Sequence, residues 1–191
     1  MKYNLLLFSI NTYDRLICTV KTNKSMLQVL EFLLKVVLMI KESIGNNELM
    51  NLPKTAFLCS RQVPAGAVLK CYDWAIAQRD GGWCIISGFH STIEKDVLHY
   101  LLKGKQPIIV ALARGLKEKV EPALQKPLDQ GRLLIVTPFY KEVKRVTRQT
   151  AHLRNQIMID VADEIVIGFV NKGGMLEGQI NDVNKNIVRL Y

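Results

Sequence analysis

From about residue 54 onward, short runs of consecutive apolar residues alternate with longer segments whose apolar residues recur at helical spacing. The runs predict strands at 55–60, 83–88, 107–113, 132–138 and 163–169, with a last short strand at 186–191. They are continuously apolar instead of alternating, which is typical of a parallel sheet covered on both faces. We therefore predict an α/β fold with a doubly wound, mostly parallel sheet and helices on both of its faces.

The segments between these runs predict helices at 65–80, 91–104, around 117–130, at 146–162 and at 175–183. One strand-to-helix junction, "IISGFHSTIE" at 85–94, allows two interpretations. Ser91 and Glu94 fit a capping box, which is sufficient to explain both residues. Ser87 and Gly88 could instead help to present backbone amides and the positive end of a helix dipole to a phosphate.

The first 49 residues differ from the rest, and we expect them to form an extension to a domain at 50–191. Residues 25–44 predict one amphipathic helix, with Ser25 and Gln28 as a capping box and Gly45 as its stop. This helix could cover a face of the sheet or dock a partner protein. The apolar run within it is too short and too polar to span a bilayer, and the start of the chain lacks a signal-peptide cleavage site.

Charge and cysteine content narrow the class of function. The 191-residue chain has a formal net charge of +9, which favours anionic partners such as nucleic acid or nucleotides. The scattered cysteines and histidines have no metal-ligand spacing, so we expect no metal site and a reduced, cytoplasmic protein. Neither G-x-G-x-x-G nor G-x-x-x-x-G-K-[ST] occurs, which argues against a dinucleotide dehydrogenase or a P-loop ATPase. We expect no cofactor.

Arginines near the predicted strand ends are candidate phosphate ligands. In a doubly wound sheet, ligands bind beyond the carboxyl ends of the strands, where Arg61 and Arg114 follow directly. Arginine binds phosphate through two parallel hydrogen bonds. For Arg61 and Arg154, phosphate contact and pairing with a carboxylate remain equal alternatives, whereas for Arg114 we favour pairing or solvation.

With these residues placed, the chain from residue 54 to about 190 resembles the Rossmann-like domain of the DNA-processing protein A family (DprA, also called Smf). This family belongs to a wider superfamily that also includes the Lonely-guy phosphoribohydrolases. The resemblance rests on "CSR" at 59–61, "SGFHSTIE" at 87–94, "RN" at 154–155 and the "GG" loop at 173–174. It implies a phosphate pocket lined by Ser60, Arg61, Ser87, Gly88, Arg154, Asn155, Gly173 and Gly174.

The resemblance implies a DNA-processing protein that binds single-stranded DNA or a nucleotide, forms a homodimer and contacts a recombinase. It favours a binding protein over an enzyme. The alternative is a nucleotide-processing phosphoribohydrolase, for which Arg154 and Glu177 are the candidate catalytic residues because they bracket the "GG" loop in the order of the related enzymes. A regulatory protein that docks through the helix at 25–44 is a further alternative.

Overall fold

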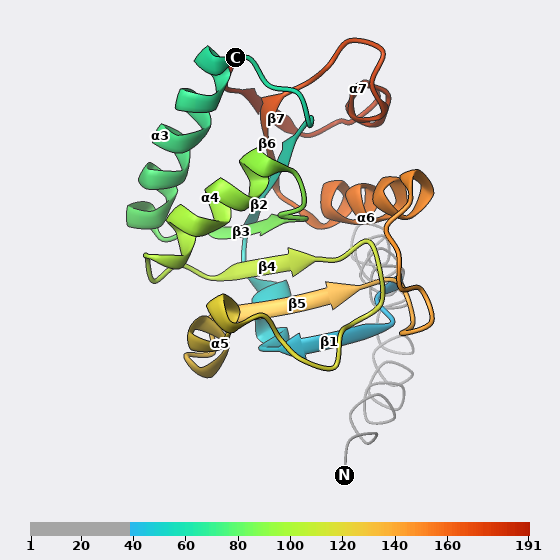
Figure 1. Ribbon diagram of the computed structural model, residues 1–191. Coiled ribbons are helices and arrows are strands. Elements are labelled where there is room, and N and C mark those ends of the chain that lie inside the picture. The colour runs from blue at the N-terminus through green and yellow to red at the C-terminus, as the bar shows by residue number, and fades with distance from the viewer. Residues whose placement is uncertain (1–38) are drawn as a thin grey trace, which may run out of the picture. The chain divides into compact units, whose positions relative to one another are not determined.

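The structure is a computed structural model, and it describes residues 39–191. These residues form a seven-stranded sheet in the order β1-β5-β4-β3-β2-β6-β7, in which only the β1–β5 pair is antiparallel (Figure 1). The strands are β1 (Glu42–Gly45), β2 (Lys54–Cys59), β3 (Cys84–Ser87), β4 (Ile108–Ala111), β5 (Leu133–Thr137), β6 (Glu164–Phe169) and β7 (Asn186–Arg189).

Helices cover both faces of the sheet. One face packs against α3 (Ala65–Gly81), α4 (Thr92–Leu102) and α5 (Pro122–Asp129). The other face packs against η1 (Asn47–Asn51), α6 (Arg148–Val161) and α7 (Met175–Ile180).

Alternate residues of each central strand enter the two core layers. Phe57 of β2 and Ile85 of β3 contribute to the layer under α3 and α4, and both are fully buried. Leu58 and Ile86, their immediate neighbours, contribute to the layer under α6. Because successive side chains of a strand point to opposite faces, only continuous apolar runs can fill both layers.

The predicted α/β fold with helices on both faces is confirmed, but the sheet is mixed because of β1. The predicted helix at 25–44 is wrong at its end, since Glu42–Gly45 pairs with β5 as an antiparallel edge strand. Gly45 does not stop a helix; it closes this strand with a φ of +111°. Residues 25–38 of that prediction lie outside the described residues.

The compact unit begins at Met39, ahead of the boundary that the sequence predicts at residue 50. Leu49 of η1 is buried in the core layer that also holds Met158 of α6. Residues just before position 50 therefore pack with the sheet. Within the described part of the chain, no helix combines the length and the apolar character that crossing a bilayer requires.

The predicted helix around 117–130 is shorter than expected. It begins only at Pro122, which occupies the first turn where a missing N–H is tolerated. Residues 116–121 form a loop whose start is fixed by a hydrogen bond from Leu116 N to Glu42 Oε2 (3.3 Å). That bond ties the start of this loop to β1.

Candidate functional site: a cationic cavity at the edge of the sheet

The candidate site lies where the direction of winding reverses. Strands β3, β4 and β5 follow β2 on one side, whereas β6 returns to the other side of β2. The chain therefore continues from β2 and from β6 to helices on opposite faces of the sheet, α3 and α7, and a crevice lies at the carboxyl edge where the winding reverses. A cavity of about 560 Å³ occupies this position. Its polar lining consists of Ser60, Arg61, Gln62, His90, Ser91, Glu94, Thr147, Arg148, Arg154, Asn155 and Asn171.

Arg154 of α6 is the central cation of this cavity and is only 5% exposed. Its Nε donates to Asn155 Oδ1 (2.8 Å) and its Nη1 donates to the Ala111 carbonyl (3.3 Å). None of the ion pairs within residues 39–191 includes Arg154. Burial lowers the pKa of the guanidinium, and the charge of Glu94 opposes that shift. Because a guanidinium has five N–H donors, Arg154 retains donors for an anion.

Gly88 lies directly against Arg154, but neither Gly88 nor Ser87 lines this cavity. Ser87 is fully buried, and its Oγ accepts a hydrogen bond from Phe89 N (3.4 Å). A Cβ at Gly88 would overlap the Arg154 guanidinium, with Nη2 at 2.8 Å and Cζ and Nη1 closer still. Gly88 thus makes room for the cation and does not itself face this cavity.

Ser60 and Arg61 line the cavity from the end of β2. Ser60 Oγ accepts a hydrogen bond from Asn171 N (3.1 Å), which ties this loop to the one that follows β6. Its hydroxyl proton remains available as a donor. Arg61 is exposed and forms no hydrogen bond or ion pair with any of residues 39–191. Its side chain is free to reach a ligand.

The other predicted residues divide between the cavity and its support. Asn155 lines the cavity, but its Nδ2 donates to Gln179 Oε1 (3.2 Å), so it links Arg154 to α7. Gly174 also lines the cavity. Gly173 does not, and its N–H donates to Glu177 Oε2 (2.6 Å). Glu177 is outside the cavity that Arg154 lines, so the two candidate catalytic residues do not share it.

The start of α4 carries the predicted capping box. Ser91 Oγ accepts from Glu94 N (3.2 Å), and Glu94 Oε2 accepts from the N–H groups of Ser91 (3.0 Å) and His90 (2.9 Å). The chain's own carboxylate therefore occupies amides that would otherwise face an anion. This junction is a conventional helix cap beside the cavity.

His90 and Arg148 also line the cavity, although sequence reasoning did not include them among the phosphate-binding residues. Partial burial lowers the pKa of His90, and the charge of Arg154 lowers it further. Arg61 and Lys95 act in the same direction, and Glu94 opposes them. Thr147 and Thr150 form a capping box that fixes the start of α6. This pair was the sequence signal that could have placed Arg148 in the first turn of α6, next to the cavity.

Comparison with known proteins shows which solved structures share this fold. No protein-family model matches the chain, and no curated protein matches it. Among solved structures, DprA from Helicobacter pylori, studied for its single-stranded DNA binding mode, is similar with a TM-score of 0.63 and 17% identity. That match covers 77% of this chain and 69% of the H. pylori protein.

DprA from Streptococcus pneumoniae is similar with a TM-score of 0.61 and 16% identity over 77% of this chain. The match spans about half of that protein, 53% of its length. A molybdenum cofactor binding protein from Rippkaea orientalis has a TM-score of 0.52 at 14% identity, covering 72% of this chain and 76% of that one. The predicted resemblance to DprA is thus confirmed at the level of the fold.

Proposed function

We propose that this protein binds single-stranded DNA by its phosphates in the cavity between the ends of β2 and β6. The observation that carries the proposal is the Arg154 guanidinium, which is buried at the cavity and forms no direct ion pair with any of residues 39–191, although the charge of Glu94 acts on it from further away. A buried charge is costly unless it is paired, so a site of this kind favours an anionic ligand. The similarity of fold to DprA, including the H. pylori protein studied with single-stranded DNA, supports the same ligand.

The surrounding charges support an extended anion more than a single phosphate. Arg61 and Arg148 are exposed and line the same cavity as the buried Arg154, and the charges of Arg154 and Arg61 act on His90. Cations at several depths can contact successive phosphates of a flexible strand. The excess of basic residues in the whole chain, with a net charge of +9, favours such a polyanion.

The phosphoribohydrolase alternative has less support. Its candidate acid, Glu177, accepts a hydrogen bond from Gly173 and lies outside the cavity. A free nucleotide as ligand, a homodimer and a recombinase partner stay predictions from the resemblance.

Arg61→Ala and Arg148→Ala test the proposal, because both side chains are exposed and their loss should leave folding intact. We expect each to weaken binding of a fluorescent oligothymidylate about tenfold, measured by anisotropy, since one charge-assisted phosphate contact contributes about 1.5 kcal/mol or more. The salt dependence of log K should also fall by about 0.7 per lost contact.

Lys70→Ala is the matched control. Lys70 is an exposed residue of α3 that does not line the cavity, so this substitution removes one positive charge at a position outside the site. Affinities of the arginine variants equal to that of Lys70→Ala would refute the site.

A further inference from the structure

A second cavity, of about 430 Å³, adjoins the first on the side of α4 and the β4–α5 loop. Arg154, His90 and Val146 line both cavities. Gly88, whose missing side chain makes room for the guanidinium, opens onto this second one. The Arg154 guanidinium therefore lies at the junction of the two cavities.

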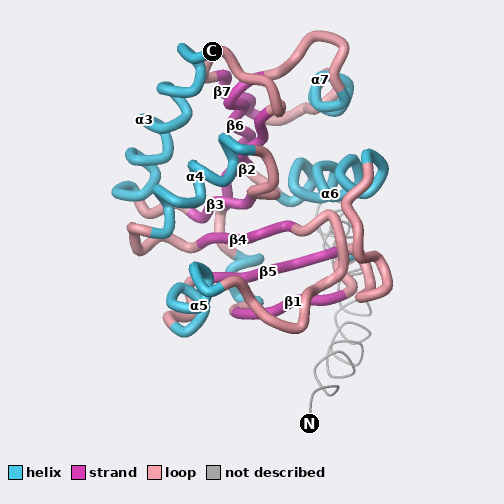
Figure 2. The backbone as a smooth tube through the Cα atoms, viewed as in Figure 1, coloured by secondary structure: helices cyan, strands magenta, loops and turns pink. Residues whose placement is uncertain are grey.

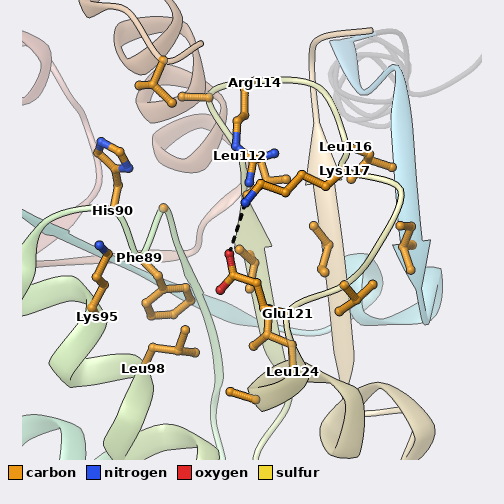
Figure 3. A pocket seen from close by; sticks show the side chains of 18 of the residues that line it. Phe89, His90, Lys95, Leu98, Leu112, Arg114, Leu116, Lys117, Glu121 and Leu124 are labelled. Carbon is orange, nitrogen blue, oxygen red and sulfur yellow. Dashed lines mark ion pairs between the residues drawn. The ribbon is translucent and has the colours of Figure 1, made fainter. Parts of the chain in front are cut away.

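The second cavity combines apolar walls with a cationic rim. Figure 3 shows Phe89 and Leu98 on one wall, and Leu112 and Leu124 on the opposite side. Its rim carries basic residues from α4 and from the β4–α5 loop, namely Lys95, Arg114, Lys117 and Lys119. Glu121 is the one acid in the lining, and its Oε1 lies 3.9 Å from Lys117 Nζ.

Backbone contacts from distant segments fix the shape of this second cavity. The β4–α5 loop is held to the β5–α6 loop by a hydrogen bond from Gly115 N to the Val143 carbonyl (2.9 Å). The two loops lie side by side at the carboxyl edge in Figure 2. On the opposite wall, Phe89 has a φ of +44°, the one non-glycine residue with a positive φ in the described chain. A bulky residue held in this conformation is a strained feature that surrounding structure must maintain.

We propose that the second cavity receives a nucleobase of the strand whose phosphate is held at Arg154. This inference rests on the proposed function and assigns it a base-binding compartment. A nucleotide pairs an apolar-faced ring with an anion, and the apolar walls and cationic rim match both parts. Base contact with aromatic and apolar side chains tolerates any sequence, because every base has a π-face. The volume of about 430 Å³ is within the range of small-molecule sites.

Abasic DNA separates the base from the phosphate in a direct test. We compare oligothymidylate with an abasic oligonucleotide of equal length and equal charge, using the full chain and fluorescence anisotropy. Oligothymidylate should bind about tenfold more tightly than the abasic strand. Ala123→Trp, at an exposed position of α5 that lines the second cavity, should remove this preference and leave abasic binding unchanged. Gln125→Trp, exposed on the same helix but outside the lining, should keep the preference.

The two proposals fail differently. If Arg61→Ala weakens both strands equally while the parent protein shows no preference for oligothymidylate, the base compartment is wrong and the phosphate site stands. If Arg61→Ala and Arg148→Ala weaken neither strand, the proposed function is wrong. Methyl NMR of the unmodified protein gives an independent readout: thymidine monophosphate should shift Leu98, Leu112 and Leu116, and unchanged signals would overturn the compartment.

Discussion

At the scale of single residues, the site depends on one buried guanidinium and on the absence of a side chain opposite it. Gly88 lies directly against Arg154, although the two residues are far apart in the sequence. The sequence marked both residues as candidates, but it assigned Gly88 to the ligand. Their mutual contact is a tertiary fact, because it depends on how α6 docks against the end of β3.

Gly88→Ala should therefore displace the Arg154 guanidinium. We expect a loss of about 1–3 kcal/mol in the free energy of unfolding, because a methyl group placed in a filled space forces its neighbours to move. Affinity for oligothymidylate should fall with it. Urea unfolding and anisotropy measure the two effects.

A double-mutant cycle supplies the control for this prediction. With Arg154→Ala as background, the space is empty, so Gly88→Ala should cost much less stability than it does in the parent. Equal costs in both backgrounds would show that the strain at Gly88 does not arise from Arg154.

At the scale of elements, the sequence predicts the central strands well and the first edge strand poorly. Strands β2 to β6 are buried on both faces, so their continuous apolar runs are unambiguous. Strand β1 has the sequence ESIG, with alternating burial and little apolar content. It follows a segment with helical periodicity, and its pairing partner β5 is remote in sequence. Nothing local could therefore reveal it.

Gly45 tests whether β1 is built as the structure shows. A Cβ there would collide with the Leu133 carbonyl oxygen, and its φ of +111° is rarely adopted by residues with side chains. Gly45→Ala should lower the free energy of unfolding by about 3 kcal/mol or more, because backbone strain and a backbone clash add.

Gly131→Ala is the matched variant for comparison. Gly131 also has a positive φ, of +68°, but a Cβ there would meet nothing within 4 Å. Gly131→Ala should lower the free energy of unfolding by only about 1 kcal/mol, which is the cost of placing a residue with a side chain in the left-handed region. Thermal unfolding of both variants measures the two losses of stability. Equal losses for Gly45→Ala and Gly131→Ala would contradict the close contact between Gly45 and Leu133.

At the scale of the whole molecule, the site is assembled by the winding of the sheet. Ser60 with Arg61 follows β2, His90 follows β3, and Arg148 and Arg154 come from α6. Their meeting at one edge follows from the predicted parallel topology, so their general neighbourhood was predictable. Which of the predicted residues line the cavity, as Arg61 does, and which lie outside it, as Gly173 does, depends on the packing of side chains and could not be predicted. The second cavity could not be predicted, because the sequence pattern assigned most of the loop at 116–121, which lines this cavity, to a helix.

Because these charges surround His90, we expect affinity for oligothymidylate to depend on pH through the protonation of His90. Its pKa lies below the ordinary value of about 6.5, because partial burial and the charges of Arg154, Arg61 and Lys95 outweigh Glu94. A bound phosphodiester would offset those cations and raise the pKa of His90 in the complex. Affinity for oligothymidylate should therefore rise about three- to tenfold as pH falls from about 7.5 to about 5.5.

The unliganded protein should respond in the opposite sense. Its folded state binds this proton less well than the unfolded state, so His90 should reduce stability as pH falls through about 6.5. Anisotropy titrations at a series of pH values measure the first effect, and thermal unfolding at the same values measures the second. His90→Gln should flatten both profiles, whereas His152→Gln, an exposed residue of α6 outside the cavity, should leave them as they are. A pH dependence that survives His90→Gln would mean that the positive field at the cavity acts through another group.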